Sequence, residues 1–461
     1  MNVPLARATA GRRAWGVPVR TLLVVLLLAA LTAGAATLEI HRAQTAHGQL
    51  SADERAYLRL ARDVVERGNW GDLGLKQPYR WAPGTPMLFA ASAWISGRPV
   101  SPGTARGAQI VVGTVLVPAT FLLAFLLAGP AAGLAAAAAV AFYVPLVRAA
   151  ATAGTETLGA LMIVLTAIAL VLALRRERPP PLACAGAGAV LGLAALVRGD
   201  LAPVAVAMPA AVALVVGRRA RARDGVLAGA AMLAGALLLM APWSIFASGH
   251  AHRFVPVTDG GAANLFIGTD LPAGGTIFGV KRQYAAETRI VHPAVRHVRW
   301  PALRQELVLD AVAAHYPGRT RDAALRAAAR DNLRRYALGR PVAFAGMEAR
   351  KLWRMWGGAY AGTHHRSGPL AIWEHRLLAL LALAGLIGGI AVTRDARLAL
   401  LAVLIVLTTI VDVAFVSEAR HNARLMPVLL AAGAAGAAGG LPLIRRARER
   451  TRSVPRPAPG T

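Results

Sequence analysis

The chain has 461 residues, of which 56% are hydrophobic and 16% charged, whereas soluble domains carry roughly 25% charged residues. Its formal net charge is +28, and arginine supplies almost all of the positive charge, with lysine only at Lys76, Lys281 and Lys351. A nucleic-acid-binding domain gathers such charge on one face or element, whereas this chain places much of it at the ends of apolar runs. We therefore exclude a nucleic-acid partner, and the single Cys184 excludes an intramolecular disulfide.

Apolar runs of roughly 17–25 residues, the length of a helix that crosses a bilayer, recur along the chain. The predicted spans are residues 20–38, 107–128, 130–147, 155–174, 181–197, 201–217, 225–247, 370–392, 396–416 and 425–443. The run at 83–97 is too short to cross, and we interpret it as an interfacial or re-entrant helix. The predicted fold is an all-α polytopic membrane protein with about ten transmembrane helices, amphipathic interfacial helices and a large outer loop.

Arginine clusters orient the predicted spans. They occur in the N-terminal tail and at 175–178, 218–223, 394–397 and 445–456, all on one side of the predicted membrane. The positive-inside rule places that side in the cytoplasm. We therefore expect a multi-pass protein of the plasma (inner) membrane with both termini cytoplasmic and the active site on the outer face.

The predicted organisation has six parts. They are a cytoplasmic tail with the first span (1–38), an outer loop with interfacial helices and the catalytic aspartate (39–106), a transmembrane core (107–247), an extracytoplasmic loop region (248–369), the C-terminal spans (370–443) and a disordered basic cytoplasmic tail (444–461).

An amphipathic interfacial helix is predicted directly after the first span, because apolar residues recur at helical spacing within 51–66. Ser51 and Glu54 form the S-x-x-E pattern of a capping box. Carboxylates in a first turn also suit the helix dipole. Capping accounts for Glu54 but does not require Asp53, so the residues alone leave open whether this acidic pair caps a helix or does chemistry.

Several segments, taken in order, resemble one enzyme family. The run Asp53-Glu54-x-x-Tyr57-x-x-x-Ala61 resembles the start of the polyprenyl-phosphate-dependent C-superfamily glycosyltransferases, of the bacterial family-39, protein O-mannosyltransferase and aminoarabinose-transferase type. Five further segments resemble motifs of the same family: "PYRWAPGTPMLFAASAWISG", "TAGTETLGALMIVL", "LVRGDLAP", "APWSIFASGHAHRFVPVTDGGAANLFIGTD" and "SEARHNARLMPVLL". The chain departs from the family pattern at Phe246-Ala247, at His421-Asn422 and at Tyr79-Arg80, where the lipid A enzymes have Glu-Lys.

The resemblance implies a membrane glycosyltransferase that moves a sugar, with inversion, from a polyprenyl-phosphate donor to an extracytoplasmic hydroxyl acceptor on a lipid, a polysaccharide or a protein. Asp53 and Glu54 are the expected catalytic pair, with Asp53 as the general base, and we expect partial burial to raise its basicity. The donor-phosphate candidates are Arg80, Arg198 and Arg420, whose alternative interpretation is snorkelling at the membrane interface. Further polar candidates for the cavity are Tyr57, Glu156, Asp200, Asn264 and Asp412.

The expected partners are the lipid-linked donor, the acceptor and the bilayer. The sequence assigns no definite cofactor, and whether a divalent cation such as Mg²⁺ or Mn²⁺ takes part stays open, because one acidic pair does not make a metal cage. A multi-span transporter and a non-catalytic membrane scaffold are the alternative functions. Gradient-coupled uptake into vesicles would distinguish the transporter from the enzyme.

Overall fold

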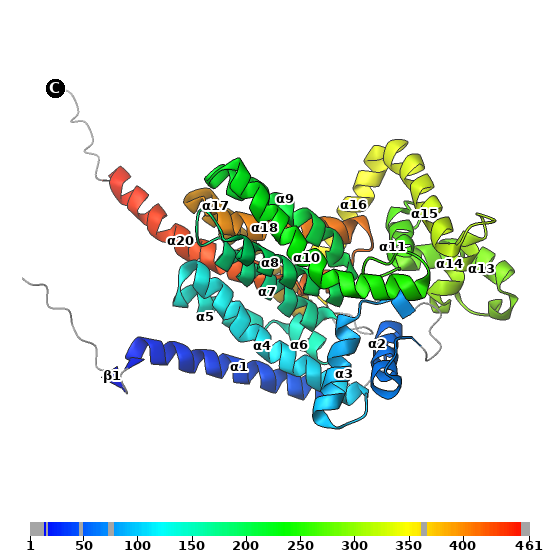
Figure 1. The fold of residues 1–461 in the computed structure, drawn as a ribbon, viewed down its shortest axis with the longest axis horizontal. Helices are drawn as coiled ribbons and strands as arrows, with labels where there is room; N and C mark the ends of the chain where they lie inside the picture. Colours follow the sequence, from blue (N-terminus) through cyan, green and yellow to red (C-terminus); the bar gives the residue numbers. More distant parts are fainter. Residues whose placement is uncertain (1–12, 15–16, 46–48, 72–77, 361–366, 453–461) are drawn as a thin grey trace, which may run out of the picture.

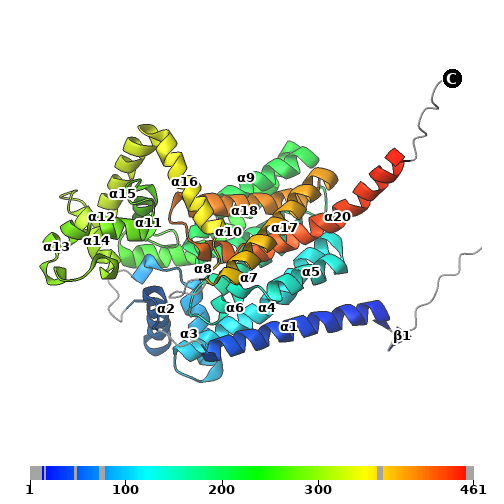
Figure 2. The ribbon, with the colours of Figure 1, turned by 180° about the vertical axis from the view of Figure 1, so that it is seen from behind.

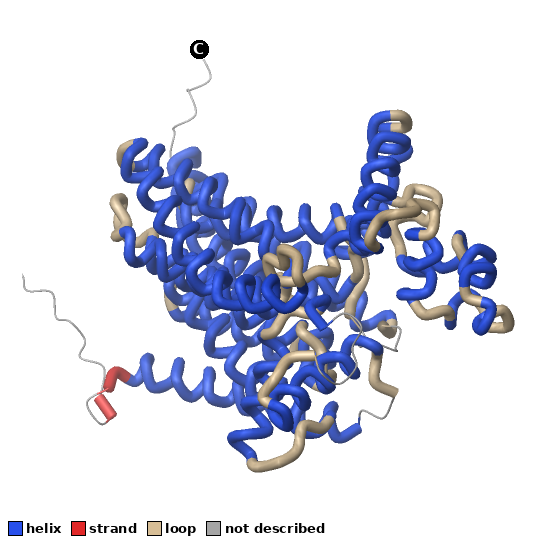
Figure 3. The backbone as a smooth tube through the Cα atoms, turned by 45° about the vertical axis from the view of Figure 1, so that its right-hand side comes forward, coloured by secondary structure: helices blue, strands red, loops and turns tan. Residues whose placement is uncertain are grey.

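The structure is a computed structural model that describes residues 13–14, 17–45, 49–71, 78–360 and 367–452. Helices make up most of this part of the chain (Figure 3), and its two strands, β1 (Arg13–Ala14) and β2 (Val17–Pro18), form one antiparallel pair of two residues each. The predicted all-α polytopic class is confirmed.

One set of helices forms a bundle (Figure 1). They are α1 (Val19–Thr45), α4 (Pro102–Ala128), α5 (Pro130–Ala141), α6 (Val144–Ala150), α7 (Glu156–Ala173), α8 (Pro181–Val197), α9 (Ala202–Arg219), α10 (Ala222–Ala251), α17 (Pro369–Thr393), α18 (Ala396–Ala414) and α20 (Met426–Arg452). In the described residues, seven are long and apolar enough to cross a membrane, α9 being counted together with the short turn before it, and α5 with α6, bent by 60°, would make an eighth. Each predicted span therefore falls on a helix or on this bent pair, although α8 and the apolar part of α20 are shorter than a full crossing.

Small residues set the spacing of the bundle helices. Gly188 and Gly192 of α8 lie against the backbone of α10, and Gly385 and Gly389 of α17 lie against that of α20, with no room for a side chain at these positions. Figure 2 shows α17 and α20 side by side from behind. Such close backbone approach drives helix association in lipid, where apolar burial between helices gains little.

The two helices that follow α1 in the chain cover one end of the bundle. They are α2 (Ala52–Arg62), which continues as a short π-helix η1 (Asp63–Arg67), and α3 (Gly84–Ser96), which has the bounds expected for the short apolar run. Ala61 of α2 shares a buried core with Phe89 and Ala90 of α3, and Tyr57 and Val65 pack against this core, so the apolar face predicted for this segment is buried on protein.

A second group of helices forms a lobe at the same end (Figure 1). Its members are α11 (Gly261–Thr269), α12 (Ile277–Gln283), α13 (Ala285–Val291), α14 (Gln305–Ala313), α15 (Arg321–Asn332) with its π-helical continuation η6 (Leu333–Leu338), and α16 (Pro341–Trp356). Phe266, Val308 and Leu325 belong to a core of its own. The chain then returns through α17 and α18 to the short α19 (Ala419–Ala423) and α20.

The C-terminal boundary differs from the prediction. Helix α20 runs to Arg452, so residues 444–452 are helical where we expected a disordered tail; residues 453–461 lie outside the described part. The physical reason is that an established helix propagates through arginine at little cost, because arginine is a good helix former. The start of α1 and the end of α20 lie at the end of the bundle opposite the lobe (Figure 1).

Candidate active site

A cavity of about 280 Å³ lies where α2, the lobe and the ends of the bundle helices meet. It is lined by most of the residues selected from the sequence: Asp53, Tyr57, Arg80, Arg198, Asp200, Asn264, Asp412 and Arg420. Their positions span more than 360 residues of sequence, so only the tertiary fold brings them together. Glu54 and Glu156 were selected too, and they do not line this cavity.

The two carboxylates at the head of α2 have different hydrogen-bond partners. Glu54 is buried; its Oε2 accepts from the Ser51 N–H (2.8 Å) and its Oε1 accepts from the Ala153 N–H (3.0 Å). The Ser51 hydroxyl accepts from the Glu54 N–H (3.2 Å), which completes the predicted capping box. Glu54 thus caps α2 and cross-links it to the segment before α7, because both of its oxygens accept from backbone amides.

Asp53 instead faces the cavity. Its Oδ1 accepts from the Trp81 indole N–H (3.2 Å), and its Oδ2 lies 3.4 Å from an Arg420 guanidinium nitrogen. Burial raises the pKa of Asp53, but the Arg420 charge, the Trp81 N–H and Arg80 outweigh burial and lower it below the ordinary value. Burial thus acts in the expected direction, but the neighbouring cations and the indole N–H reverse its effect, so the carboxylate is a weaker base than an ordinary aspartate when no substrate is present.

Three arginines reach the same cavity from different elements. Arg80, in the 3₁₀ turn η2 (Pro78–Arg80), lies 3.1 Å from Glu306 of the lobe. Arg198 ends α8 and donates to the Thr155 hydroxyl (2.8 Å). Arg420 of α19 lies 3.0 Å from Glu418 as well as near Asp53, and these carboxylates raise its pKa. All three donor-phosphate candidates thus face one cavity, which snorkelling alone would not require.

A second set of charges lies deeper, at the bundle ends. Arg424 is fully buried and donates to both oxygens of Asp200 (2.8 Å each) and both oxygens of Asp412 (2.6 and 2.7 Å). Arg198 also pairs with Asp200 (2.9 Å) and lies 3.8 Å from Glu156. This network fixes the start of α7, the end of α8, the turn before α9 and the end of α18 to the segment after α19.

Comparison with known proteins gives matches at the level of sequence family and fold. Residues 80–246, less than half of the chain, match the family described as dolichyl-phosphate-mannose-protein mannosyltransferase. The archaeal oligosaccharyltransferase AglB from Archaeoglobus fulgidus, solved with an inhibitory peptide and a dolichol-phosphate, superposes with a TM-score of 0.54 at 13% identity over 95% of this chain and 53% of that one. The chain has the fold of the C-superfamily glycosyltransferases.

Two further solved structures also match. The apo form of the Archaeoglobus fulgidus oligosaccharyltransferase gives a TM-score of 0.54 at 15% identity, covering 94% of this chain and 52% of that one. ArnT from Cupriavidus metallidurans bound to undecaprenyl phosphate gives 0.40 at 16% identity, covering 94% and 81%. This chain thus spans about half the length of the archaeal enzyme. Comparison with curated protein sequences finds no match.

Besides Arg80, the departure from the C-superfamily glycosyltransferase pattern at His421-Asn422 also lies at the cavity. His421, where the family has an aromatic residue after its late arginine, lines the cavity with its Nδ1 3.6 Å from Asp412. Burial and the neighbouring arginines lower the pKa of His421 well below the ordinary value, so the imidazole is neutral. Asn422 is buried and donates to the carbonyl oxygens of Met355 and Gly358, which ties α19 to the end of α16.

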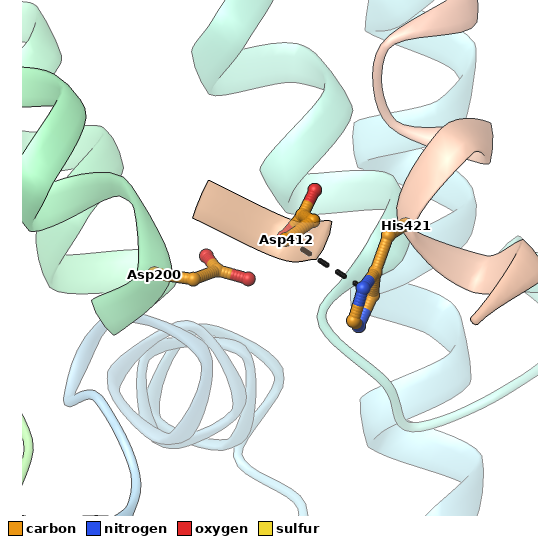
Figure 4. Close-up of side chains that lie close together, drawn as sticks. All are labelled: Asp200, Asp412 and His421. Atoms are coloured by element: carbon orange, nitrogen blue, oxygen red, sulfur yellow. Dashed lines mark ion pairs between the residues drawn. The ribbon is translucent and has the colours of Figure 1, made fainter. Parts of the chain in front are cut away.

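The described part of the chain contains one group of three potential metal ligands whose ligand atoms lie within 4.8 Å of one another. Its members are Asp200, Asp412 and His421 (Figure 4). They do not fit a divalent cation as arranged, because the Arg424 guanidinium already donates to all four carboxylate oxygens. A metal ion there would have to displace a buried charge of the same sign. We therefore derive no step through a metal at this cluster.

Sequence reasoning missed Arg424, Trp81 and Glu306. A usable signal existed for Arg424, because an aspartate inside a span needs a cationic partner, and Arg424 follows Arg420 by one helical turn. No comparable signal exists for Glu306, which reaches Arg80 across 226 positions of sequence.

Proposed function

We propose that the chain is a glycosyltransferase that moves a sugar from a polyprenyl-phosphate donor to a hydroxyl acceptor on the outer face of the plasma (inner) membrane. One observation carries the proposal: the ionised Asp53 carboxylate and three arginines line the same cavity. A base for the acceptor and cations for the leaving phosphate are the two chemical requirements of this reaction.

In the proposed reaction the acceptor oxygen attacks the anomeric carbon while its proton passes to Asp53. The bond between the anomeric carbon and the phosphate oxygen breaks, and its electron pair stays on the phosphate. The phosphodiester carries one negative charge and the departing monoester gains a second, which Arg80, Arg198 and Arg420 are placed to stabilise. A single displacement inverts the anomeric carbon.

Arg420 connects the proposed base, Asp53, with the proposed binding of the donor phosphate. It is bound to Asp53 and Glu418 when no substrate is present, and a phosphate drawn into the cavity would compete for its guanidinium. Loss of that ion pair removes a charge that lowers the pKa of Asp53, so donor binding would strengthen the base.

The proposed orientation follows from the ends of the helices that carry the cavity. Helix α7 begins at the cavity, α8 ends there, the turn before α9 lies there and α18 ends there. The arginine-rich connections at 175–178, 218–223 and 394–397 therefore lie at the other end of the bundle, where α1 begins and α20 ends. The positive-inside rule then favours cytoplasmic termini and an outer cavity.

Purified protein supplied with radiolabelled polyprenyl-phosphate sugars tests the proposal. We expect the wild type to consume one of these donors and Asp53→Asn to lower the rate by about 10²–10⁴-fold. Glu66→Gln, which changes an exposed carboxylate on the π-helix after α2, is the matched control and should keep wild-type activity. Unchanged activity in Asp53→Asn would contradict the base assignment, and gradient-coupled uptake without donor consumption would favour a transporter.

A further inference from the structure

The lobe contains a second cavity, of about 650 Å³, that shares no lining residue with the first. It lies among α11, α12, α14, α15 and η6. Its volume is within the range of about 300–1,000 Å³ that small-molecule sites occupy. Buried Phe266, Val312 and Ala328 form its apolar base, and polar side chains surround them.

Two polar side chains that line this cavity are buried or nearly so. Asp270 is 1% exposed; its Oδ1 accepts from the Ala273 N–H (3.3 Å), and the side chain of Gln283, which also lines the cavity, hydrogen-bonds to the same carboxylate. The Asn332 side-chain nitrogen is buried without a hydrogen-bond partner among the described residues. A ligand hydroxyl could accept from this nitrogen and donate to a carboxylate, because a hydroxyl both donates and accepts hydrogen bonds.

Aromatic and basic side chains complete the cavity. Tyr284, Tyr316 and Tyr336 line it, and each offers an apolar ring face together with a polar hydroxyl. Arg334 and Arg335 add planar groups of donors. This mixture of ring faces with converging donors and acceptors suits a ligand that has apolar C–H faces and many hydroxyls.

Residues of η6 form part of the wall of the second cavity. Arg334, Arg335 and Tyr336 are consecutive residues of η6, where α15 changes from α-helical to π-helical geometry. π-helical turns are rare and occur frequently at functional sites.

Helix α11 separates the two cavities. Asn264 and Ile267 line the first, whereas Phe266 and the helix-terminal Asp270 line the second. We propose that the second cavity binds a saccharide and holds a glycan acceptor beside the transfer site. The acceptor part rests on the proposed function, whereas saccharide binding stands independently of it.

An oligosaccharide array probed with the purified full-length protein in detergent micelles tests this inference. We expect the wild type to bind at least one immobilised glycan, and the same glycan to show the contact in saturation-transfer NMR. Asp270→Asn keeps the shape and the Ala273 bond but loses an acceptor, and Tyr336→Ala loses a ring; each should weaken binding by about tenfold or more. Arg330→Gln, an exposed change on α15 outside the cavity, should bind as the wild type does.

The outcomes separate this inference from the proposed function. Asp53→Asn should keep full glycan binding, because it alters only the first cavity. Glycan binding without donor consumption would sustain the saccharide site and overturn the proposed reaction. The saccharide site is overturned if no glycan on the array binds above background, or if folded Asp270→Asn and folded Tyr336→Ala both bind as the wild type does; melting temperature and gel filtration establish folding.

Discussion

Two charged groups border the first cavity, and they differ in depth and in how tightly they are paired. The inner group centres on Arg424, which is fully buried and holds both aspartates at 2.6–2.8 Å. The outer group centres on Arg420 and Asp53, whose side chains are 32% and 41% exposed and lie 3.4 Å apart. The inner group therefore acts as a fixed frame for the helix ends, and the outer group can exchange its partners for a substrate.

The largest expected effect comes from breaking the inner group. Arg424→Met leaves Asp200 and Asp412 buried without their shared cation, and we expect this to destabilise the fold by about 3–5 kcal/mol. Thermal unfolding of the detergent-solubilised protein measures the change. Arg420→Met, in the outer group, should change stability by about 1 kcal/mol or less. Equal losses in the two variants would remove the distinction between the groups.

The next effect concerns transfer activity. Arg420→Gln should lower kcat by about 10²–10³-fold, because it removes one cation from the developing charge on the phosphate. Arg340→Gln, an exposed arginine of the lobe outside the cavity, provides the control. Donor-consumption rates at saturating donor measure the effect. A change confined to KM would place Arg420 in donor binding alone.

A smaller effect separates the two carboxylates at the head of α2. Glu54→Ala leaves the buried Ala153 N–H without its acceptor and removes half of the capping box, which should cost about 1–3 kcal/mol of stability. The folded fraction should still transfer sugar, because Asp53 is intact. Thermal unfolding together with activity per folded molecule tests this, and complete loss of activity in folded protein would return Glu54 to the catalytic group.

The smallest effect is a shift in pH dependence. The Asp53 pKa is lowered, so its ionised form should persist as the pH falls, and loss of the base should appear only on the acid side of the ordinary aspartate pKa. In Arg420→Gln the cation that lowers this pKa is gone, so the acidic limb of kcat/KM should move to higher pH. A pH profile of the residual activity measures the shift, and an unmoved limb would show that Asp53 is not the titrating group.

Sequence patterns predicted those features that rest on local physics. The apolar runs located the bundle helices, and Ser51 with Glu54 located the start of α2, because span length and capping depend on residues close together in the chain. Local reasoning failed at the C-terminus, where α20 continues to Arg452, and it did not reach the second cavity, whose lining residues come from five elements.

The sequence by itself determined that this is a helical membrane protein with an acidic helix start after the first span, because hydropathy and capping are properties of neighbouring residues. Only the tertiary structure decided which carboxylate faces the cavity. Asp53 and Glu54 are adjacent in sequence, and their roles separate because the Ala153 N–H binds one while Trp81 and Arg420 approach the other. These partners lie 28 to 367 positions away, so packing of the bundle had to bring them into contact.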